Sequence, residues 1–475
     1  MTKAWKFNDS SQPGFPSTFA IAKKAVLQVT DLKNNNNKYY GIELHTSAQG
    51  CRVFTHYGRT DDLENDPNAG AKESRYFASL GEAQVEYDSI YKQKTSKSKG
   101  YQEVSLASSK IGSQQARGQS SGHVDDKTLS KGASGASDAP KAPKASVKSS
   151  TLSDGVQEMV KYIYAEATTA LTSTVAAKIT ANGIETPLGV LTVGQVEKGE
   201  QILDEINQAV KAKASHSRLE DLSGEFYSAI PHRIGRTRDA IASSVIDALA
   251  DIVAKQETLQ LMKDMLAVNS GGKAVLFENN LDDQYQALGV TIAQLEGNSG
   301  PFKEIQDHVL SSQVKSKNIK VVNVFTLQRQ GEWHAFDTKV GSEKLMFHGS
   351  RIKNWVGILS RGILMPKMAV SMGVNRTDAG WLGNGIYFGD ASCTAAFYTT
   401  PGTKKTRMMA IARVALGNMK EFTKITYGLD APPSGYDSCH GLRNRKGLPS
   451  QFEDDEYVIY RQNQQRLEYL VELTA

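Results

Sequence analysis

Short runs of β-branched and aromatic residues alternate with polar turns in the first hundred positions of the chain, and they predict strands. The runs are 25–29, 39–44 and 51–55. An asparagine cluster at 34–37 predicts the turn between the first two strands. Apolar positions from Ala83 to Tyr91 predict a helix. We therefore expect a small mixed α/β domain over residues 1–104.

From Leu152 the apolar positions change to a helical period. One face of the predicted helix is apolar and consists of Val156, Met159, Val160, Ile163 and Tyr164. Thr192 followed by Gln195 has the form of a capping box at the start of a second helix. Further amphipathic runs follow at 219–227, 241–253 and 259–266. The pattern predicts an all-α helical bundle over residues 151–290.

Strand-like runs return in the last part of the chain. They are 321–327, 344–348, 407–418 and 467–473. Between them, residues 354–361 predict a helix that turns Trp355 and Leu359 inward. Residues 300–475 are therefore expected to form an α+β domain, and the whole chain a multidomain α+β protein, as its 475 residues also suggest.

Residues 105–150 are rich in Ser, Gly, Ala, Lys and Pro and contain almost no large apolar side chain. Such a segment buries too little surface to offset the entropy of ordering, so we expect a disordered linker. Its seven Lys and Arg against three Asp give it four of the five net positive charges of the chain. Non-specific contact with nucleic acid and a plain tether both remain open for this segment.

The composition predicts a soluble intracellular protein without a membrane partner. No run of eighteen apolar residues occurs, and the N-terminus lacks the apolar centre of a secretory signal. Cys51, Cys393 and Cys439 are odd in number and far apart, which argues against a disulfide framework. Cys439 and His440 have no second pair at ligand spacing, so we expect them in a plain loop and predict no metal.

Three chemically useful side chains stand where predicted strands meet turns. They are His348 within 345–351, Tyr387 within 383–390 and Glu456 within 455–460. Their motifs read His-Gly-Ser-Arg, Gly-x-Gly-Ile-Tyr-Phe and Glu-Tyr-x-x-Tyr, over about 110 residues. This ordered set resembles the His-Tyr-Glu signature of the poly(ADP-ribose) polymerase branch of the ADP-ribosyltransferases. The resemblance implies an antiparallel-rich ADP-ribosyltransferase sheet and NAD as the substrate.

The resemblance also implies roles in breaking the bond between nicotinamide and ribose. Glu456 would accept a hydrogen bond from a ribose hydroxyl, concentrate negative charge near C1′ and orient the nucleophile. At an ordinary pKa of about 4.3 it is ionised at neutral pH. His348 would donate to a ribose hydroxyl, and Gly349 would let the main chain approach the nicotinamide amide. Tyr387 and Tyr398 would stack on the nicotinamide ring. The adenosine end of NAD would lie near Ser350, Asn354 and Gly357.

Three positions depart from the family pattern. Ala395 replaces a Ser that hydrogen-bonds the nicotinamide amide, Thr394 replaces a Lys near the reacting ribose, and Leu364 replaces a commonly basic residue. One lost hydrogen bond costs about 0.5 to 1.5 kcal/mol, so we expect weaker NAD binding without loss of activity. Residues 363–380 lie where the family has its donor loop.

The N-terminal part resembles the WGR module through His56-Tyr-Gly-Arg-Thr60, with Tyr57 in place of the Trp and a longer loop after Arg59. The resemblance implies contact with DNA ends or nicks through Tyr57 and Arg59. A core position for Tyr57 and a solvated surface charge for Arg59 remain an alternative.

The helical part contains two phrases, 186–195 and 226–235, that resemble the regulatory domain of the same family. That domain would cover the NAD cleft until an activator loosens it. Shifting such a gate from 1:99 to 99:1 takes about 5.5 kcal/mol, which a DNA end engaging several domains could supply. A purely structural brace is the alternative.

Together these features predict an NAD-dependent poly- or mono-ADP-ribosyltransferase activated by DNA breaks, nuclear in a eukaryote and otherwise cytoplasmic. The expected partners are DNA ends and acceptor proteins, including the chain itself; a partner that completes the acceptor site is left open. Two alternatives remain. One is a DNA-end sensor with a weak or inactive NAD pocket, and the other is a DNA-independent mono-ADP-ribosyltransferase.

Overall fold

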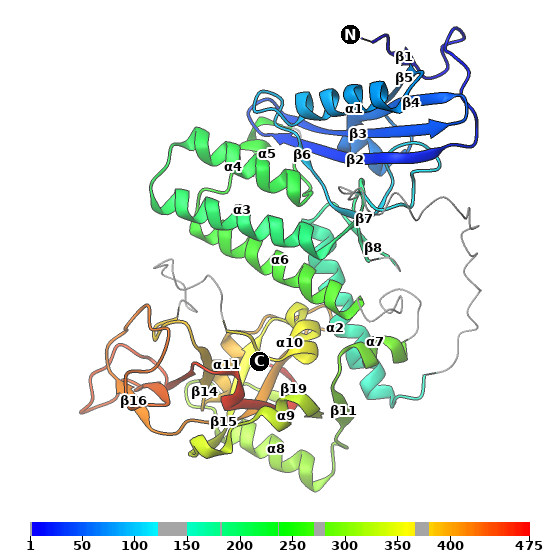
Figure 1. The fold of residues 1–475 in the computed structure, drawn as a ribbon. Coiled ribbons are helices and arrows are strands. Elements are labelled where there is room, and N and C mark those ends of the chain that lie inside the picture. The colour runs from blue at the N-terminus through cyan, green and yellow to red at the C-terminus, as the bar shows by residue number, and fades with distance from the viewer. Residues whose placement is uncertain (1, 122–149, 181–182, 236, 270–280, 366–379) are drawn as a thin grey trace. The chain divides into compact units, whose positions relative to one another are not determined.

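The computed structural model describes residues 2–121, 150–180, 183–235, 237–269, 281–365 and 380–475. Contacts divide the chain into two compact units, one from residues 1–146 and 171–266 and the other from 147–170 and 267–475 (Figure 1). None of the described helices combines the length and the apolar composition needed to cross a bilayer.

A six-stranded antiparallel sheet forms the N-terminal part of the first unit. Its strands are β1 (Trp5–Lys6), β2 (Ala20–Asp31), β3 (Asn36–Ser47), β4 (Gly50–Arg59), β5 (Ala71–Phe77) and β6 (Gln102–Glu103). Their order is β1-β5-β4-β3-β2-β6, and α1 (Leu80–Lys94) lies across the sheet (Figure 1). Tyr87 and Ile90 of the helix share a buried core with Leu27, Ile42 and Val53 of the strands. The mixed α/β domain predicted from the sequence is confirmed.

Residues 105–121, which were expected to begin the disordered linker, are folded. Within them β7 (Leu106–Ser109) pairs with β10 (Gly189–Leu191), and the sheet continues through β9 (Gly183–Glu185) to β8 (Lys178–Thr180). Ile111 and Ala116 are fully buried, and Ser113 donates to the buried Glu43 carboxylate through its main-chain N (2.9 Å) and its hydroxyl (2.6 Å). The prediction of a linker over 105–150 is wrong for 105–121, because composition does not reveal a partner strand or a buried acceptor. Residues 122–149 lie outside the described residues.

The middle of the chain is predominantly helical. Its helices are α2 (Asp154–Thr174), α3 (Val193–Lys211), α4 (His216–Ala229), α5 (Arg238–Ala242), α6 (Leu249–Asn269) and α7 (Leu281–Ala287). Thr192 caps α3 by accepting a hydrogen bond from Gln195 N at 3.1 Å. The Gln195 side chain does not complete the predicted capping box; it accepts from Ser105 N and donates to Ala229 O. It thereby ties the N-terminal module to the helices within the first unit.

A nine-stranded sheet dominates the second unit. Its strands are β11 (Thr291–Gln294), β12 (Lys320–Gln328), β13 (Glu343–Ser350), β14 (Ile386–Gly389), β15 (Arg407–Ala415), β16 (Met419–Phe422), β17 (Ser438–Gly441), β18 (Glu456–Ile459) and β19 (Gln465–Thr474). Their order is β11-β12-β19-β15-β13-β14-β18-β17-β16, and every neighbouring pair except β16 with β17 is antiparallel. Cys439 and His440 therefore lie in a strand, and the prediction of a plain loop for them is wrong.

Four of the described helices belong to the same part of the chain, and at least one of them packs against the sheet to form its core. They are α8 (Gly300–Ser311), α9 (Gln330–Ala335), α10 (Trp355–Arg361) and α11 (Ser392–Phe397). Phe302, Ile305 and Val309 of α8 share a core with Phe347 and Met409 of the central strands. The antiparallel-rich sheet predicted for residues 300–475 is confirmed, and it fixes the strand ends that carry the three sequence motifs.

Candidate active site

Three neighbouring strands carry His348, Tyr387 and Glu456. Gly389 of β14 pairs with Phe347 of β13 on one side and with Glu456 of β18 on the other. His348 and Glu456, about 110 positions apart in sequence, therefore lie on the two strands that flank β14. His348 and Tyr387 touch directly, because Nδ1 of the imidazole lies 3.0 Å from the main-chain oxygen of Tyr387.

The hydrogen bond of His348 fixes its tautomer. A carbonyl oxygen can only accept, so Nδ1 of His348 carries the proton and donates it to Tyr387 O. Burial lowers the pKa of His348, so the ring is neutral at pH 7. Nε2 is then a lone-pair acceptor. The predicted donation from His348 to a ribose hydroxyl does not fit this tautomer, in which Nε2 can only accept; the contact with the ribose stays a prediction.

The Glu456 carboxyl is not an ordinary surface acid. Burial, with a smaller contribution from the negative charge of Asp454, raises the pKa of Glu456 from 4.5 to about 7. The expectation of an unshifted pKa is therefore wrong. Within the described part of the chain, no hydrogen bond or ion pair engages this carboxyl group. A half-buried carboxyl that titrates near neutral pH is suited to holding charge and exchanging a proton with a reactant.

Tyr387 is held rigidly by its hydroxyl. The oxygen accepts from Leu382 N at 2.9 Å and donates to Gly383 O at 2.8 Å. Burial raises the pKa of Tyr387, so it stays a neutral phenol. Tyr398, just after α11, keeps 36% of its surface exposed and meets Phe397 edge to face. Its stacking role on nicotinamide stays a prediction.

Packing by itself requires a glycine at position 349. A Cβ at this position would overlap the main-chain carbonyl oxygen of Ala395 in α11. The missing side chain thus lets α11, which leads into Tyr398, lie directly on β13. The reason given for Gly349 from the sequence is incomplete, because the approach of α11 already demands a glycine.

The residues expected at the adenosine end follow the end of β13. Asn354 Nδ2 donates to Ser350 Oγ at 3.0 Å, and Gly357 is buried inside α10. These contacts order the turn between β13 and α10. Their role in binding NAD stays a prediction.

The positions that depart from the family pattern lie beside this site. Ala395 is buried in α11, and the Oγ1 atom of its neighbour Thr394 is buried without a hydrogen-bond partner in the described part of the chain. Leu364 is half-buried after α10. Of the expected donor loop, residues 366–379 lie outside the described residues.

The two residues expected to contact DNA both have partners within the chain. The Tyr57 ring stacks on Tyr40 at 5.2 Å between centroids, and its hydroxyl donates to Glu73 at 2.8 Å. Arg59 donates to Asn35 O at 3.2 Å and pairs with Asp61 at 3.4 Å. Tyr57 thus belongs partly to the core of this module, and DNA contact by the two residues stays a prediction.

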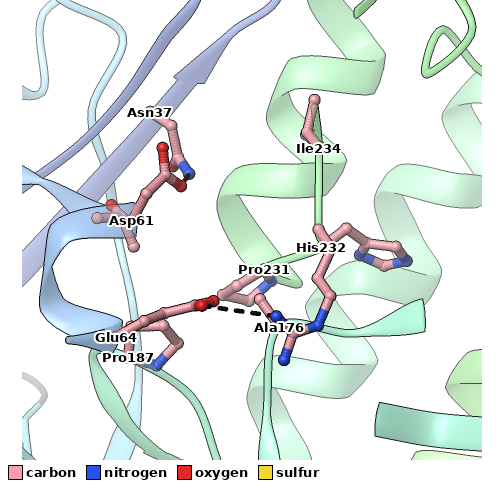
Figure 2. Close-up of a pocket in the computed structure, with 10 residues that line it drawn as sticks. Asn37, Asp61, Glu64, Ala176, Pro187, Pro231, His232 and Ile234 are labelled. Carbon is pink, nitrogen blue, oxygen red and sulfur yellow. Dashed lines mark hydrogen bonds and ion pairs between the residues drawn. The ribbon is translucent and has the colours of Figure 1, made fainter. Parts of the chain in front are cut away.

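The loop after Arg59 lines a pocket of about 190 Å³ within the first unit (Figure 2). Thr60, Asp61 and Glu64 come from this loop, while Pro231 to Ile234 come from the segment after α4. An ion pair of 3.5 Å joins Glu64 to Arg233 (Figure 2). The module that carries Arg59 therefore contacts the phrase 226–235, and Pro187 of the phrase 186–195 lines the same pocket.

Sequence reasoning missed the charged surroundings of Glu456. Arg443 lies 3.5 to 3.7 Å from carboxylate oxygens of Asp390, Asp454 and Asp455. The acids before Glu456 were visible in the sequence. Their cationic partner, Arg443, lies twelve residues before Asp455 in an irregular segment, so the sequence did not reveal the pairing. Among the described residues, no group of three His, Cys, Asp or Glu side chains is arranged to hold a metal ion.

Family models match the three folded parts of the chain. The WGR domain model matches residues 23–107, the poly(ADP-ribose) polymerase regulatory domain model matches 150–285, and the poly(ADP-ribose) polymerase catalytic domain model matches 299–475. The chain therefore belongs to the poly(ADP-ribose) polymerase family, whose catalytic domain uses NAD as its substrate.

Relatives named for single transfer and relatives named as polymerases are both similar to this chain. Human protein mono-ADP-ribosyltransferase PARP4 is 32% identical over 336 residues, which are 69% of this chain and 18% of the relative. Mouse protein mono-ADP-ribosyltransferase PARP3 is 24% identical over 94% of this chain and 87% of its own length. Human poly [ADP-ribose] polymerase 2 is 25% identical over 94% of this chain and 79% of its own length. The chain thus spans less than a fifth of the PARP4 relative.

Proposed function

We propose that this chain transfers ADP-ribose from NAD to proteins, including itself. The proposal rests on one observation above all: the titratable Glu456, the neutral His348 and the half-buried Tyr387 lie on three neighbouring strands of the matched catalytic domain. In the reaction the bond between C1′ of ribose and the nicotinamide nitrogen breaks, and its electron pair leaves with nicotinamide. The acceptor atom then bonds to C1′.

The side chains divide this work by their chemistry. Ionised Glu456 accepts a hydrogen bond from a ribose hydroxyl, stabilises positive charge at C1′ and takes the proton of the acceptor. His348 Nε2 accepts from a second ribose hydroxyl, which fixes the sugar. Tyr387 and Tyr398 offer aromatic surface to the nicotinamide ring. The loss of one amide hydrogen bond at Ala395 weakens NAD binding by about 0.5 to 1.5 kcal/mol.

We further propose that DNA strand breaks stimulate this activity as part of the response to DNA damage. The WGR match and the Glu64–Arg233 ion pair support this, because they link the module that carries Arg59 to the regulatory segment.

The test is incorporation of labelled NAD by the purified chain with and without nicked DNA. Label that rises with DNA supports the proposal. Equal label in both conditions identifies a DNA-independent transferase, and no label in either identifies a sensor with an inactive pocket. A ladder or a single band on a gel separates polymer from single transfer.

Activity should depend on pH through Glu456. Because the pKa of Glu456 is about 7, the side chain is mostly protonated below that pH. The protonated form cannot stabilise the positive charge that develops at C1′. We expect kcat/KM to rise about tenfold per pH unit up to about pH 7 and to level off above it. Initial rates of label transfer measured across this range test the prediction. A flat profile between about pH 5.5 and 8 contradicts it.

The first part of α2 is suited to restraining the catalytic domain. Within the second unit, Glu166 Oε1 accepts from Thr403 N at 2.7 Å and from Thr403 Oγ1 at 2.6 Å. Glu158 pairs with Lys404 at 3.0 Å, and Gly402 lies against the Tyr162 ring. Gly402, Thr403 and Lys404 form a loop that begins four residues after Tyr398. We propose that these contacts are one of the restraints that activation releases.

Removing one of these contacts should raise activity in the absence of DNA. Glu166→Ala loses two hydrogen bonds to the loop, worth about 1 kcal/mol on a partly exposed side chain. If the gate is mostly closed, the open fraction and the DNA-free rate should rise about fivefold, while the DNA-stimulated maximum stays unchanged. Asp154→Asn, at an exposed position of the same helix, is the matched control and should change neither rate. An unchanged DNA-free rate in Glu166→Ala assigns α2 a bracing role only.

A further inference from the structure

Three carboxyl groups crowd the start of β18 beside Glu456. Asp454 and Asp455 directly precede it, and Asp390 follows Gly389, the residue that pairs with Glu456 on β14. Each nearby negative charge disfavours the ionised form of Glu456. Burial of Glu456 acts in the same direction. An uncompensated cluster of this kind would leave Glu456 protonated at neutral pH.

Arg443 is the cation best placed to compensate. Its Nε lies 3.7 Å from Asp454 Oδ1 and 3.7 Å from Asp455 Oδ2, and its Nη2 lies 3.5 Å from Asp390 Oδ1. Only 22% of its side chain is exposed, so solvent screens these pairs weakly. Nε and Nη2 make no hydrogen bond within the described part of the chain. The guanidinium therefore acts through its charge rather than through a bidentate bond.

The main chain around Arg443 is fixed to the same strand. Gly441 of β17 pairs directly with Glu456, and Arg443 N donates to Asp455 Oδ1 at 3.2 Å. His440 Nε2 lies 2.8 Å from the same oxygen. Arg443 thus connects the end of β14, the segment after β17 and the start of β18.

The other charged and titratable groups near Glu456 are less suited to this task. Lys315 pairs with Asp454 at 3.2 Å, but it is 46% exposed and shared with Glu453, which is 82% exposed. His348 and Tyr387 are neutral by burial. Arg443 is thus the less exposed of the two cations that pair with Asp454, and it is the one that also reaches Asp455 and Asp390.

We propose that Arg443 is a positioning residue for the transfer reaction: its charge offsets Asp454 and Asp455 and holds the start of β18, so that Glu456 is ionised and correctly placed. This inference rests on the proposed function of Glu456, but its central claim concerns ionisation and can be measured without turnover. The positive charge at position 443 is the property that matters, so Arg443→Lys should retain the effect.

The test measures the apparent pKa of Glu456 through stability. The folded-state pKa exceeds the unfolded value, so ionisation of Glu456 costs folding free energy as pH rises from about 4.5 to 7, and the cost is constant above. The difference in unfolding temperature between each chain and its Glu456→Gln counterpart, followed from about pH 5 to 9, reports this pKa. This difference grows with pH and reaches a plateau once Glu456 is ionised in the folded chain. In Arg443→Gln the plateau should begin about one pH unit higher than in wild type.

Matched variants separate charge from general disruption. Arg461→Gln, near the other end of β18 and 52% exposed, should leave the plateau in place. Asp454→Asn should move it to lower pH, and combining it with Arg443→Gln should return it toward wild type. If Arg443→Gln alone does not fold, the double variant decides: its plateau should begin about one pH unit above that of Asp454→Asn, and equal plateaus overturn the proposal. Superimposed curves for wild type, Arg443→Gln and Asp454→Asn overturn the proposal.

Label transfer supplies the second readout. The acid limb of kcat/KM should move up by the same pH unit in Arg443→Gln, which lowers the rate at pH 7 about fivefold and restores it near pH 9. A loss that is equal at every pH shows a merely structural role and also overturns the proposal. A wild-type chain that transfers no label refutes the proposed function, while the stability curves still decide whether Arg443 controls Glu456.

Discussion

Replacing Glu456 by Gln should lower kcat for ADP-ribose transfer by about 10² to 10³. The amide keeps the shape of the side chain but cannot stabilise positive charge at C1′ or take the proton of the acceptor, and losing one preorganised electrostatic partner typically costs this much. Binding of NAD should change little, because the lost interaction matters most in the transition state. Initial rates of label transfer at pH 8, with DNA present, measure the effect.

The stability of the variant distinguishes chemistry from misfolding. Because ionised Glu456 costs folding free energy above about pH 7, Glu456→Gln should unfold no earlier than wild type at pH 8. Glu343→Gln, at the exposed start of β13, is the matched control and should retain the wild-type rate. A rate within tenfold of wild type would remove Glu456 from the reaction.

Much of this site could be predicted because local sequence carries it. Apolar runs before His348 and after Glu456 mark strands, and the ordered motifs indicate that those strands meet. The antiparallel-rich sheet and the family followed from the same residues. Pattern reasoning succeeded where a residue's own neighbours in sequence decide its structure.

The errors concern properties that distant residues decide. The tautomer of His348 depends on a carbonyl 39 positions later, and the pKa of Glu456 depends on burial by the finished sheet. Residues 105–121 looked too polar to fold, yet Glu43 and a partner strand order them. Composition estimates what a segment can bury alone; it does not include the acceptors and strands that the rest of the chain provides.

The role of Gly349 leads to the second large effect. Gly349→Ala places a methyl group against the carbonyl oxygen of Ala395, which is backbone and cannot rotate away. Either β13 or α11 must move, and we expect a loss of about 3 kcal/mol in the free energy of unfolding. For a unit of this size that lowers the unfolding temperature by roughly 6 to 12 °C. Thermal unfolding followed by calorimetry measures the shift.

The same substitution at an open glycine provides the control. Gly331→Ala lies in α9 with no atom within 4 Å of the added methyl group, so it should be neutral or stabilise by up to about 1 kcal/mol. Activity should follow the same contrast. In Gly349→Ala the displaced α11 carries Tyr398 away from β13, so transfer should be lost even at temperatures where the chain stays folded. A Gly349→Ala chain with wild-type stability and activity would mean that the contact between α11 and β13 limits neither property.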